Sequence, residues 1–349
     1  MRCRVGHWSD ELVSPWTIRE LDPSDDAVVA AIIDFDNAWT LQRFGTREQP
    51  TLAQARVGMT NTPYWQLHRF GVFDGARMVA HLHIDLPLQD NVALAYLSIL
   101  VDPAWRGRGI GTALADEAKR RCDQLGRARM ELYGELENDQ NADDAALPVN
   151  RLAARLGVTR RNVAVCRSMP LPVPDQTLDQ IGHVVAPKLG EYRVETFTGQ
   201  VPRQHWARYG ELLMQLQQDE PDEDVEREVP TYDEERIRVN YERKAQTGRT
   251  SVTAVAIAPN GTWVGNSTIE WNMEPGSTMA WQENTLVMPE HRGHRLGWAM
   301  KAATHRALNE SAPQLRHIAT WNSHINDQMI AINEALGYRP AFREITFQS

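Results

Sequence analysis

Two stretches of the sequence carry the same pattern: Val-Asp-Pro-Ala-Trp-Arg-Gly-Arg-Gly-Ile-Gly at 101–111 and Val-Met-Pro-Glu-His-Arg-Gly-His-Arg-Leu-Gly at 287–297. They align without a gap at a constant offset of 186 residues, since position 101 corresponds to position 287. Each copy follows an apolar run and precedes a stretch with helical spacing. The repetition predicts a duplicated α/β domain with two related ligand sites.

The first copy is expected to form a turn between a strand and a helix. Leu94 to Val101 is a buried strand by its apolar character, Pro103 ends it, and apolar residues recur at helical spacing from Ala113. The free amides and positive dipole at a helix start bind anions, and glycines let a phosphate come close. The residues predicted to bind it are Val101, Arg106, Gly107, Arg108, Gly109, Ile110 and Gly111.

The second copy repeats this design with one change. Arg295 replaces the middle glycine, and we expect it in the first helical turn in the right-handed conformation, where a side chain is tolerated. The corresponding predicted residues are Val287, Met288, Arg292, Gly293, His294, Arg295, Leu296 and Gly297.

Other glycine-rich loops fit the sequence less well. A dinucleotide-binding loop follows the first strand of its domain, whereas this loop follows what looks like a fourth strand. A Walker loop needs Gly-Lys-Ser/Thr, which neither copy contains. A glycine-rich turn without any ligand is the remaining alternative, and the duplication argues against it.

The loop, Arg-x-x-Gly-x-Gly after a strand ending in Val-x-Pro, resembles the acyl-CoA pyrophosphate loop of the GNAT N-acetyltransferase superfamily. The second half also matches a later family element, with Asn326 as its Asn and Gly337-Tyr338 as its Gly-Phe. The whole chain is similar to two-domain actinobacterial acetyltransferases such as mycothiol synthase. The resemblance implies an α/β fold of two tandem GNAT-like domains, each a mixed central sheet flanked by helices, with acetyl-CoA as cofactor and Asn326 facing its pantetheine arm.

Catalysis is expected in the second half. An amine attacks a thioester only as the free base, and Glu283, on the expected strand 281–287, is the candidate general base. A salt-bridge role for Glu283 is the open alternative. The offset pairs it with Leu97, which cannot move protons. By resemblance, the backbone N–H of Val287 supports the thioester carbonyl, and Asn333 stands where many family members place a tyrosine that protonates the departing thiolate.

The first half is expected to have lost its chemistry. An acidic insert at 135–144 follows its last expected central strand, and Ala153 occupies the tyrosine position. The predicted organisation is therefore an N-terminal, non-catalytic GNAT-like domain at 1–170, a proline-marked linker at 171–190 with a connecting helix, and a catalytic domain at 191–349.

Composition limits the partners. A net charge of −9 argues against nucleic acid, and no apolar run reaches the length of a membrane span. Three scattered cysteines fit a reduced compartment, so we expect a soluble cytoplasmic protein, monomeric or homodimeric. Core packing is expected for Cys122 and Cys166. His81 and His83 lie on one strand face without a visible third ligand, so no metal is expected.

Two functions remain open. The first is transfer of an acetyl group from acetyl-CoA to a small-molecule amine, in a direct reaction. The second is a non-catalytic or regulatory acyl-CoA-binding protein. The acidic run 219–224 either attracts a cationic amine or is simply a solvated loop.

Overall fold

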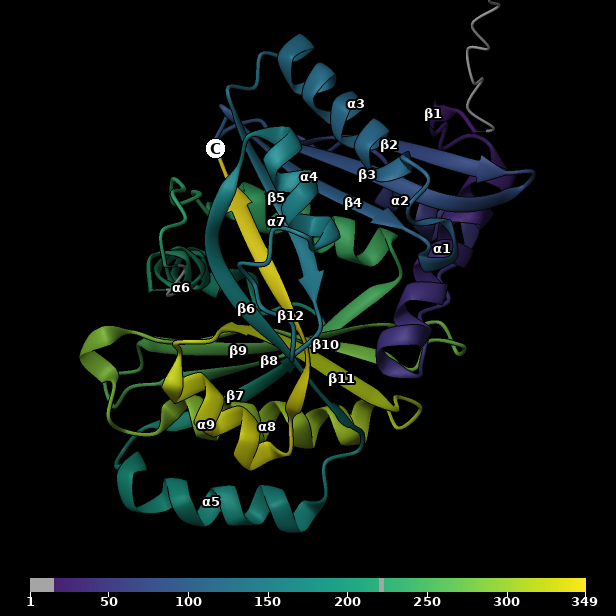
Figure 1. Ribbon diagram of the computed structural model, residues 1–349. Coiled ribbons are helices and arrows are strands. Elements are labelled where there is room, and N and C mark those ends of the chain that lie inside the picture. Colours follow the sequence, from purple (N-terminus) through teal and green to yellow (C-terminus); the bar gives the residue numbers. More distant parts are fainter. Residues whose placement is uncertain (1–15, 220–222) are drawn as a thin grey trace, which may run out of the picture.

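One continuous mixed sheet runs through the molecule (Figure 1). The computed structural model describes residues 16–219 and 223–349, so Cys3 and positions 220–222 of the acidic run lie outside the described residues. The order is β1-β2-β3-β4-β5-β12-β6-β11-β10-β9-β8-β7. The strands are β1 (Ile18–Glu20), β2 (Trp65–Asp74), β3 (Arg77–Pro87), β4 (Leu94–Val101), β5 (Arg129–Leu136), β6 (Thr159–Pro170), β7 (Arg193–Thr198), β8 (Arg249–Ile257), β9 (Trp263–Asn272), β10 (Met279–Val287), β11 (His317–Ser323) and β12 (Arg339–Gln348).

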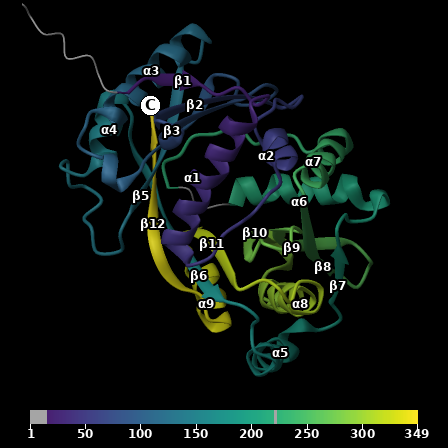
Figure 2. The same cartoon turned by 90° about the vertical axis from the view of Figure 1, so that its right-hand side faces the viewer.

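Helices cover both faces of the sheet. In the first half, α3 and α4 pack on one face and α1 and α2 on the other; in the second half, α5, α8 and α9 oppose α6 and α7 (Figures 1 and 2). The helices are α1 (Asp26–Phe44), α2 (Leu52–Gly58), α3 (Ile110–Gln124), α4 (Pro148–Leu156), α5 (Asp175–Leu189), α6 (Trp206–Asp219), α7 (Glu234–Gln246), α8 (Leu296–Ser311) and α9 (Asp327–Leu336). None of these helices is long and apolar enough to span a membrane.

The two halves exchange their last strands. β12, from the end of the chain, pairs with β5 of the first half, and β6 of the first half pairs with β11 of the second. β6 and β12 also pair with each other, which joins the two expected sheets into one. α1 lies across this junction (Figure 2), where Phe44 contacts Trp281 and Phe342. The domain limits 1–170 and 191–349 stay a prediction. They assign β6 to the first domain and β12 to the second, although these two strands pair with each other.

A separate core surrounds the central helix of each half, and each core also includes residues of the exchanged strands. Leu97 and Leu114 belong to the core under α3, and Ile269 and Leu308 belong to the core under α8. The expected connecting helix is α5, which packs on α8 instead of running free. Cys122 and Cys166 are buried, and burial raises the pKa of both thiols, to about 11 for Cys122. Both cysteines therefore serve packing.

Candidate functional site

Both repeated loops form the expected strand-to-helix turn, with the same side-chain contact. The Nε of Arg106 donates to the carbonyl of Val101 at 3.2 Å, and the Nε of Arg292 donates to the carbonyl of Val287 at 3.1 Å. Gly107 and Gly293 both have positive φ angles, 77° and 88°. The turn is thus the same local structure twice, and its guanidinium groups are held beside a helix start.

The expected conformation of Arg295 was wrong. Arg295 is the N-cap of α8 with φ 55° and ψ 30°, the left-handed region, and Gly109 holds the same place before α3 with φ 81°. The turn needs this conformation to redirect the chain into the helix, so it is retained even without glycine. A left-handed arginine costs about 1–2 kcal/mol in backbone strain. Its guanidinium donates to the carbonyl of Val184 in α5 at 2.6 Å.

The two halves differ in how far their central parallel strands stay together. β4 pairs with β5 up to Ser98, whereas β10 pairs with β11 only up to Trp281 and then diverges. In addition, the register of β10 against β9 shifts between Gln282 and Thr285, so that β10 contains one extra residue there. The ladder of β4 against β3 has no such shift. A bulge and an early splay therefore open the sheet in the second half.

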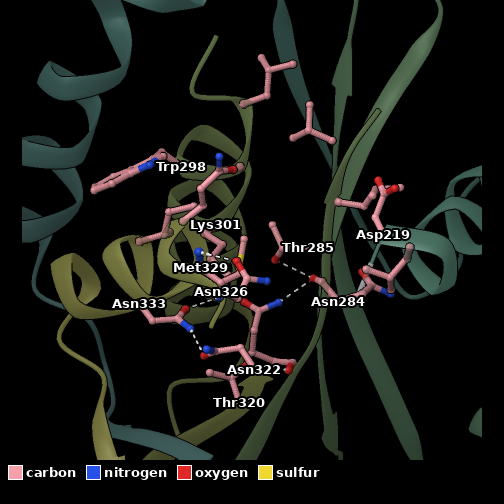
Figure 3. A pocket seen from close by; sticks show the side chains of 18 of the residues that line it. Asp219, Asn284, Thr285, Trp298, Lys301, Thr320, Asn322, Asn326, Met329 and Asn333 are labelled. Atoms are coloured by element: carbon pink, nitrogen blue, oxygen red, sulfur yellow. Dashed lines mark hydrogen bonds between the residues drawn. The ribbon is translucent and has the colours of Figure 1, made fainter. Parts of the chain in front are cut away.

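A cavity of about 920 Å³ occupies this opening (Figure 3). It extends from the loop at the start of α8, between β10 and β11, to α9. Of the residues predicted for the second site, those that line it are Glu283, Val287, Arg292, Gly293, Arg295, Leu296, Gly297, Asn326 and Asn333. A smaller cavity of about 230 Å³ adjoins it and shares Gln217 and Tyr232.

Other predicted residues lie apart from the cavity. Met288 and His294 do not line it; the Nδ1 of His294 lies 3.2 Å from the carbonyl oxygen of Lys188. The first-half residues, Val101 and the loop 106–111, line neither of the two cavities. There Leu152 of α4 lies close to Gly111, and Val149 packs on Gly134 of β5, so that α4 sits tightly against the strands.

Glu283 lies within the bulge and faces the cavity. Its side chain is exposed at the wall of the cavity. Partial loss of water and the nearby Glu270 raise the pKa of Glu283 to about 7, although Arg249 and Lys244 oppose this shift. Glu48, from the segment after α1, also raises it. A carboxyl group with this pKa exchanges protons readily at neutral pH.

The expected pairing of Glu283 with Leu97 was also wrong, because the bulge shifts the alignment by one residue. Thr268 of β9 faces the bulge that contains Glu283 and Asn284, and His83, at the same place in β3, pairs with Ser98. Leu97 points into the core under α3. In the first half, Ser98 therefore occupies the position that corresponds to the bulge with Glu283. Neither serine nor leucine is a base at neutral pH.

The carbonyl-binding amide expected at Val287 has a suitable orientation. The N–H of Met288 donates to the carbonyl of Val264 on β9 at 2.9 Å. Because successive amides in an antiparallel ladder point to opposite sides, the N–H of Val287 points away from β9, into the opening toward β11. Asn326 caps α9, and its Oδ1 accepts the N–H of Met329 at 3.1 Å.

Asn333 belongs to a buried polar chain that the sequence reasoning missed. The Nζ of Lys301 donates to Oδ1 of Asn333 at 2.6 Å, and Nδ2 of Asn333 donates to Oδ1 of Asn322 at 3.2 Å. Arg167, from β6 of the first half, donates to the same Asn322 oxygen at 3.1 Å. A lysine inside the apolar stripe of an expected helix was the signal that could have revealed this chain.

Two further predicted features are engaged within the protein. The described part of the acidic run has partners within the protein, which weakens its case as an attractor of amines: Asp219 forms an ion pair with Arg292, and Oε1 of Glu223 lies 3.2 Å from Nδ1 of His324. The ring of His81 is buried and its centre lies 4.1 Å from that of the half-buried His83; burial lowers the pKa of His81 to about 3. Residues 16–219 and 223–349 hold no group of three metal-ligating side chains.

Comparisons with known proteins agree with this geometry. Residues 32–147 match the model of the acetyltransferase (GNAT) family. A tandem GNAT protein from the clavulanic acid biosynthesis pathway superposes with a TM-score of 0.73 at 23% identity, over 96% of this chain and 98% of the other. A GCN5-related N-acetyltransferase from Sphaerobacter thermophilus gives 0.64 at 14%, over 96% and 95%. The search of curated proteins gave no significant match.

A third structure shares the fold with a bound acyl-CoA. N-myristoyltransferase of Saccharomyces cerevisiae with myristoyl-CoA superposes with a TM-score of 0.59 at 12% identity, over 97% of this chain and 80% of the other. Residues 32–147 therefore match a GNAT acetyltransferase domain, and the whole chain has the fold of a tandem GNAT protein.

Proposed function

We propose that the protein transfers an acetyl group from acetyl-CoA to the amine of a small molecule, with the reaction in the second half. The observation that carries the proposal is Glu283 at the bulge, inside a cavity that begins at a phosphate-type loop. Acetyl-CoA supplies the acetyl group as a thioester. A cavity of about 920 Å³ is of the size that holds a ligand of this kind.

Several residues fit the phosphate end of the donor. The amides at the start of α8 and the guanidinium of Arg292 suit an anion, and Gly293 and Gly297 leave room for its approach. Arg292 is paired with Asp219 in this structure. A pyrophosphate would compete with Asp219 for Arg292, which couples donor binding to the end of α6.

Other residues fit the reacting end. Glu283 removes the proton from the attacking amine, either directly or through a water molecule. The N–H of Val287 donates a hydrogen bond to the carbonyl oxygen as negative charge develops there. Because the pKa of Glu283 is raised to about 7, its carboxylate is a stronger base than an ordinary glutamate while still largely ionised above neutral pH.

The test is release of free CoA thiol from acetyl-CoA with a panel of small amines, diamines and amino sugars. We expect at least one amine to give turnover above hydrolysis, together with a product heavier by one acetyl group. Tight binding of acetyl-CoA without release of thiol with any amine would favour the non-catalytic alternative. Longer acyl-CoA donors in the same assay test the preference for acetyl.

A further inference from the structure

Lys301 stands out among the buried residues of the second half. It lies on α8 one turn after Gly297, is fully buried, and lines the inner part of the cavity. An ammonium group has three hydrogens to donate, and the structure gives it one acceptor, Oδ1 of Asn333. Within residues 16–219 and 223–349 it forms no ion pair. A buried cation without an anion is costly, so lysine at this place calls for a function.

The groups around Lys301 leave its charge unbalanced. From α9, Asn333 accepts its hydrogen bond, and Figure 3 shows the two side chains projecting toward each other from neighbouring helices. Tyr338, which follows α9, places its ring 5.5 Å from Nζ. His305, on the next turn of α8, accepts or donates a hydrogen bond with the Tyr338 hydroxyl, and burial and the Lys301 charge lower its pKa to about 3. No carboxylate contributes: burial alone lowers the pKa of Lys301 to about 7.

The proposed reaction needs a proton at the leaving thiolate, and Lys301 lines the same cavity as Glu283. Among the described residues, the side-chain hydrogen bond of Lys301 goes to Asn333, which by resemblance occupies the position of the family's acid tyrosine. Asparagine cannot supply a proton at neutral pH, whereas an ammonium group can. In the first half, the residue at the same offset on α3 is Ala115, which is fully buried.

We propose that Lys301 is the acid that protonates the departing CoA thiolate, taking over a role that Asn333 cannot perform. This inference rests on the proposed function. Asn333 holds the ammonium in place and is a positioning residue, itself fixed by Asn322 and Arg167.

The proton balance closes with two groups of this chain. The amine nitrogen forms the new bond to the acetyl carbon and passes one proton to Glu283. The carbon–sulfur bond breaks, its electron pair stays on sulfur, and Lys301 passes one proton to that sulfur. The products are the acetamide and the free CoA thiol. Glu283 is then protonated and Lys301 is neutral, and exchange of one proton through solvent restores both groups.

The test measures the ionisation of the CoA thiol on the protein, which needs no acceptor. Ultraviolet absorbance of the thiolate is followed against pH for CoA bound to the wild type, to Lys301→Met and to the control Lys119→Met, an exposed lysine on α3. We expect the bound thiol to ionise at least one pH unit lower in the wild type and the control than in Lys301→Met. The same titration in all three proteins, with CoA bound, would overturn the proposal.

Turnover gives the second readout and separates the two proposals. We expect Lys301→Met to lower kcat about 100-fold and to remove the decline of kcat above pH 7, with KM for acetyl-CoA nearly unchanged. Lys301→Gln, which keeps a hydrogen bond to Asn333 without an acid, should behave alike. Unchanged kcat in both variants would overturn the acid role. Failure of the wild type to acetylate any amine would refute the proposed function, while the thiol titration would still decide whether Lys301 faces the sulfur.

Discussion

The two halves carry nearly the same loop, but the cavity of about 920 Å³ lies at the loop of the second half. Arg106 and Arg292 make the same contact, and both helices begin after a left-handed residue. The strands that precede the two loops differ. β10 has a bulge against β9 and stops pairing with β11 after Trp281, whereas β4 has no bulge against β3 and pairs with β5 up to Ser98. In the second half the phosphate-type loop therefore occurs together with separated strands and a cavity between them.

The sequence match and the cavity point to different halves. The family model matches residues 32–147, which contain the loop with all three glycines. The cavity lies in the half whose loop has Arg295 instead. A family pattern scores residue identities in the loop, whereas the cavity depends on strand register, which one inserted residue changes.

The largest expected difference concerns the base. Glu283→Gln keeps the size of the side chain and removes its basicity, so we expect kcat for amine acetylation to fall about 100-fold or more. In the wild type, kcat should decline below about pH 7, where Glu283 takes up a proton, and the variant should lack this decline. Ser98→Ala, at the matching position of the first half, should leave kcat unchanged. A larger loss in Ser98→Ala than in Glu283→Gln would move the chemistry to the first half.

The loops are compared by placing a carboxylate in each. Gly293→Asp and Gly107→Asp introduce the same strain, because both glycines have positive φ and no atom lies within 4 Å of an added Cβ. Only Gly293→Asp should weaken acetyl-CoA binding, by at least ~1 kcal/mol, through repulsion of the phosphates. Calorimetric titration of both variants measures this. Equal losses would mean that both loops bind the donor.

The buried lysine predicts an unusual dependence of stability on pH. The folded pKa of Lys301 is about 7, lower than the usual lysine value, so its cost to the folded state is complete below pH 7 and fades as pH rises to the unfolded pKa. At pH 6, the free energy of unfolding of Lys301→Met should therefore exceed that of the wild type by more than ~1 kcal/mol, which raises its unfolding temperature. This gain in stability should shrink toward pH 10. Lys119→Met should show no such trend. A gain independent of pH would contradict a buried charge.

The smallest effect is expected at the N-caps. Arg295→Gly relieves left-handed strain and should stabilise the fold by ~1 kcal/mol, less the lost hydrogen bond to Val184. Gly109→Arg should destabilise the first half by a similar amount. Denaturant unfolding of the two variants gives both values. If both substitutions changed stability in the same direction, backbone strain would not be the cause.

The sequence predicted the local elements better than their assembly. The duplicated loop, the strand Leu94–Val101 and the helix after Asn326 were confirmed, because each depends on residues close in the chain. The exchange of β6 and β12 could not be foreseen, since strand order depends on contacts between distant segments. The bulge at Glu283 could not be predicted for the same reason, because a single sequence does not show how β9 and β10 align with each other.

A crystal structure of the protein with acetyl-CoA is the most direct test of a donor site in the second half. We expect the pyrophosphate at 292–297, the thioester carbonyl at the N–H of Val287, the sulfur near Lys301, and Glu283 on the open side of the acetyl group. Acetyl-CoA bound at 106–111, with the cavity between β10 and β11 empty, would contradict it.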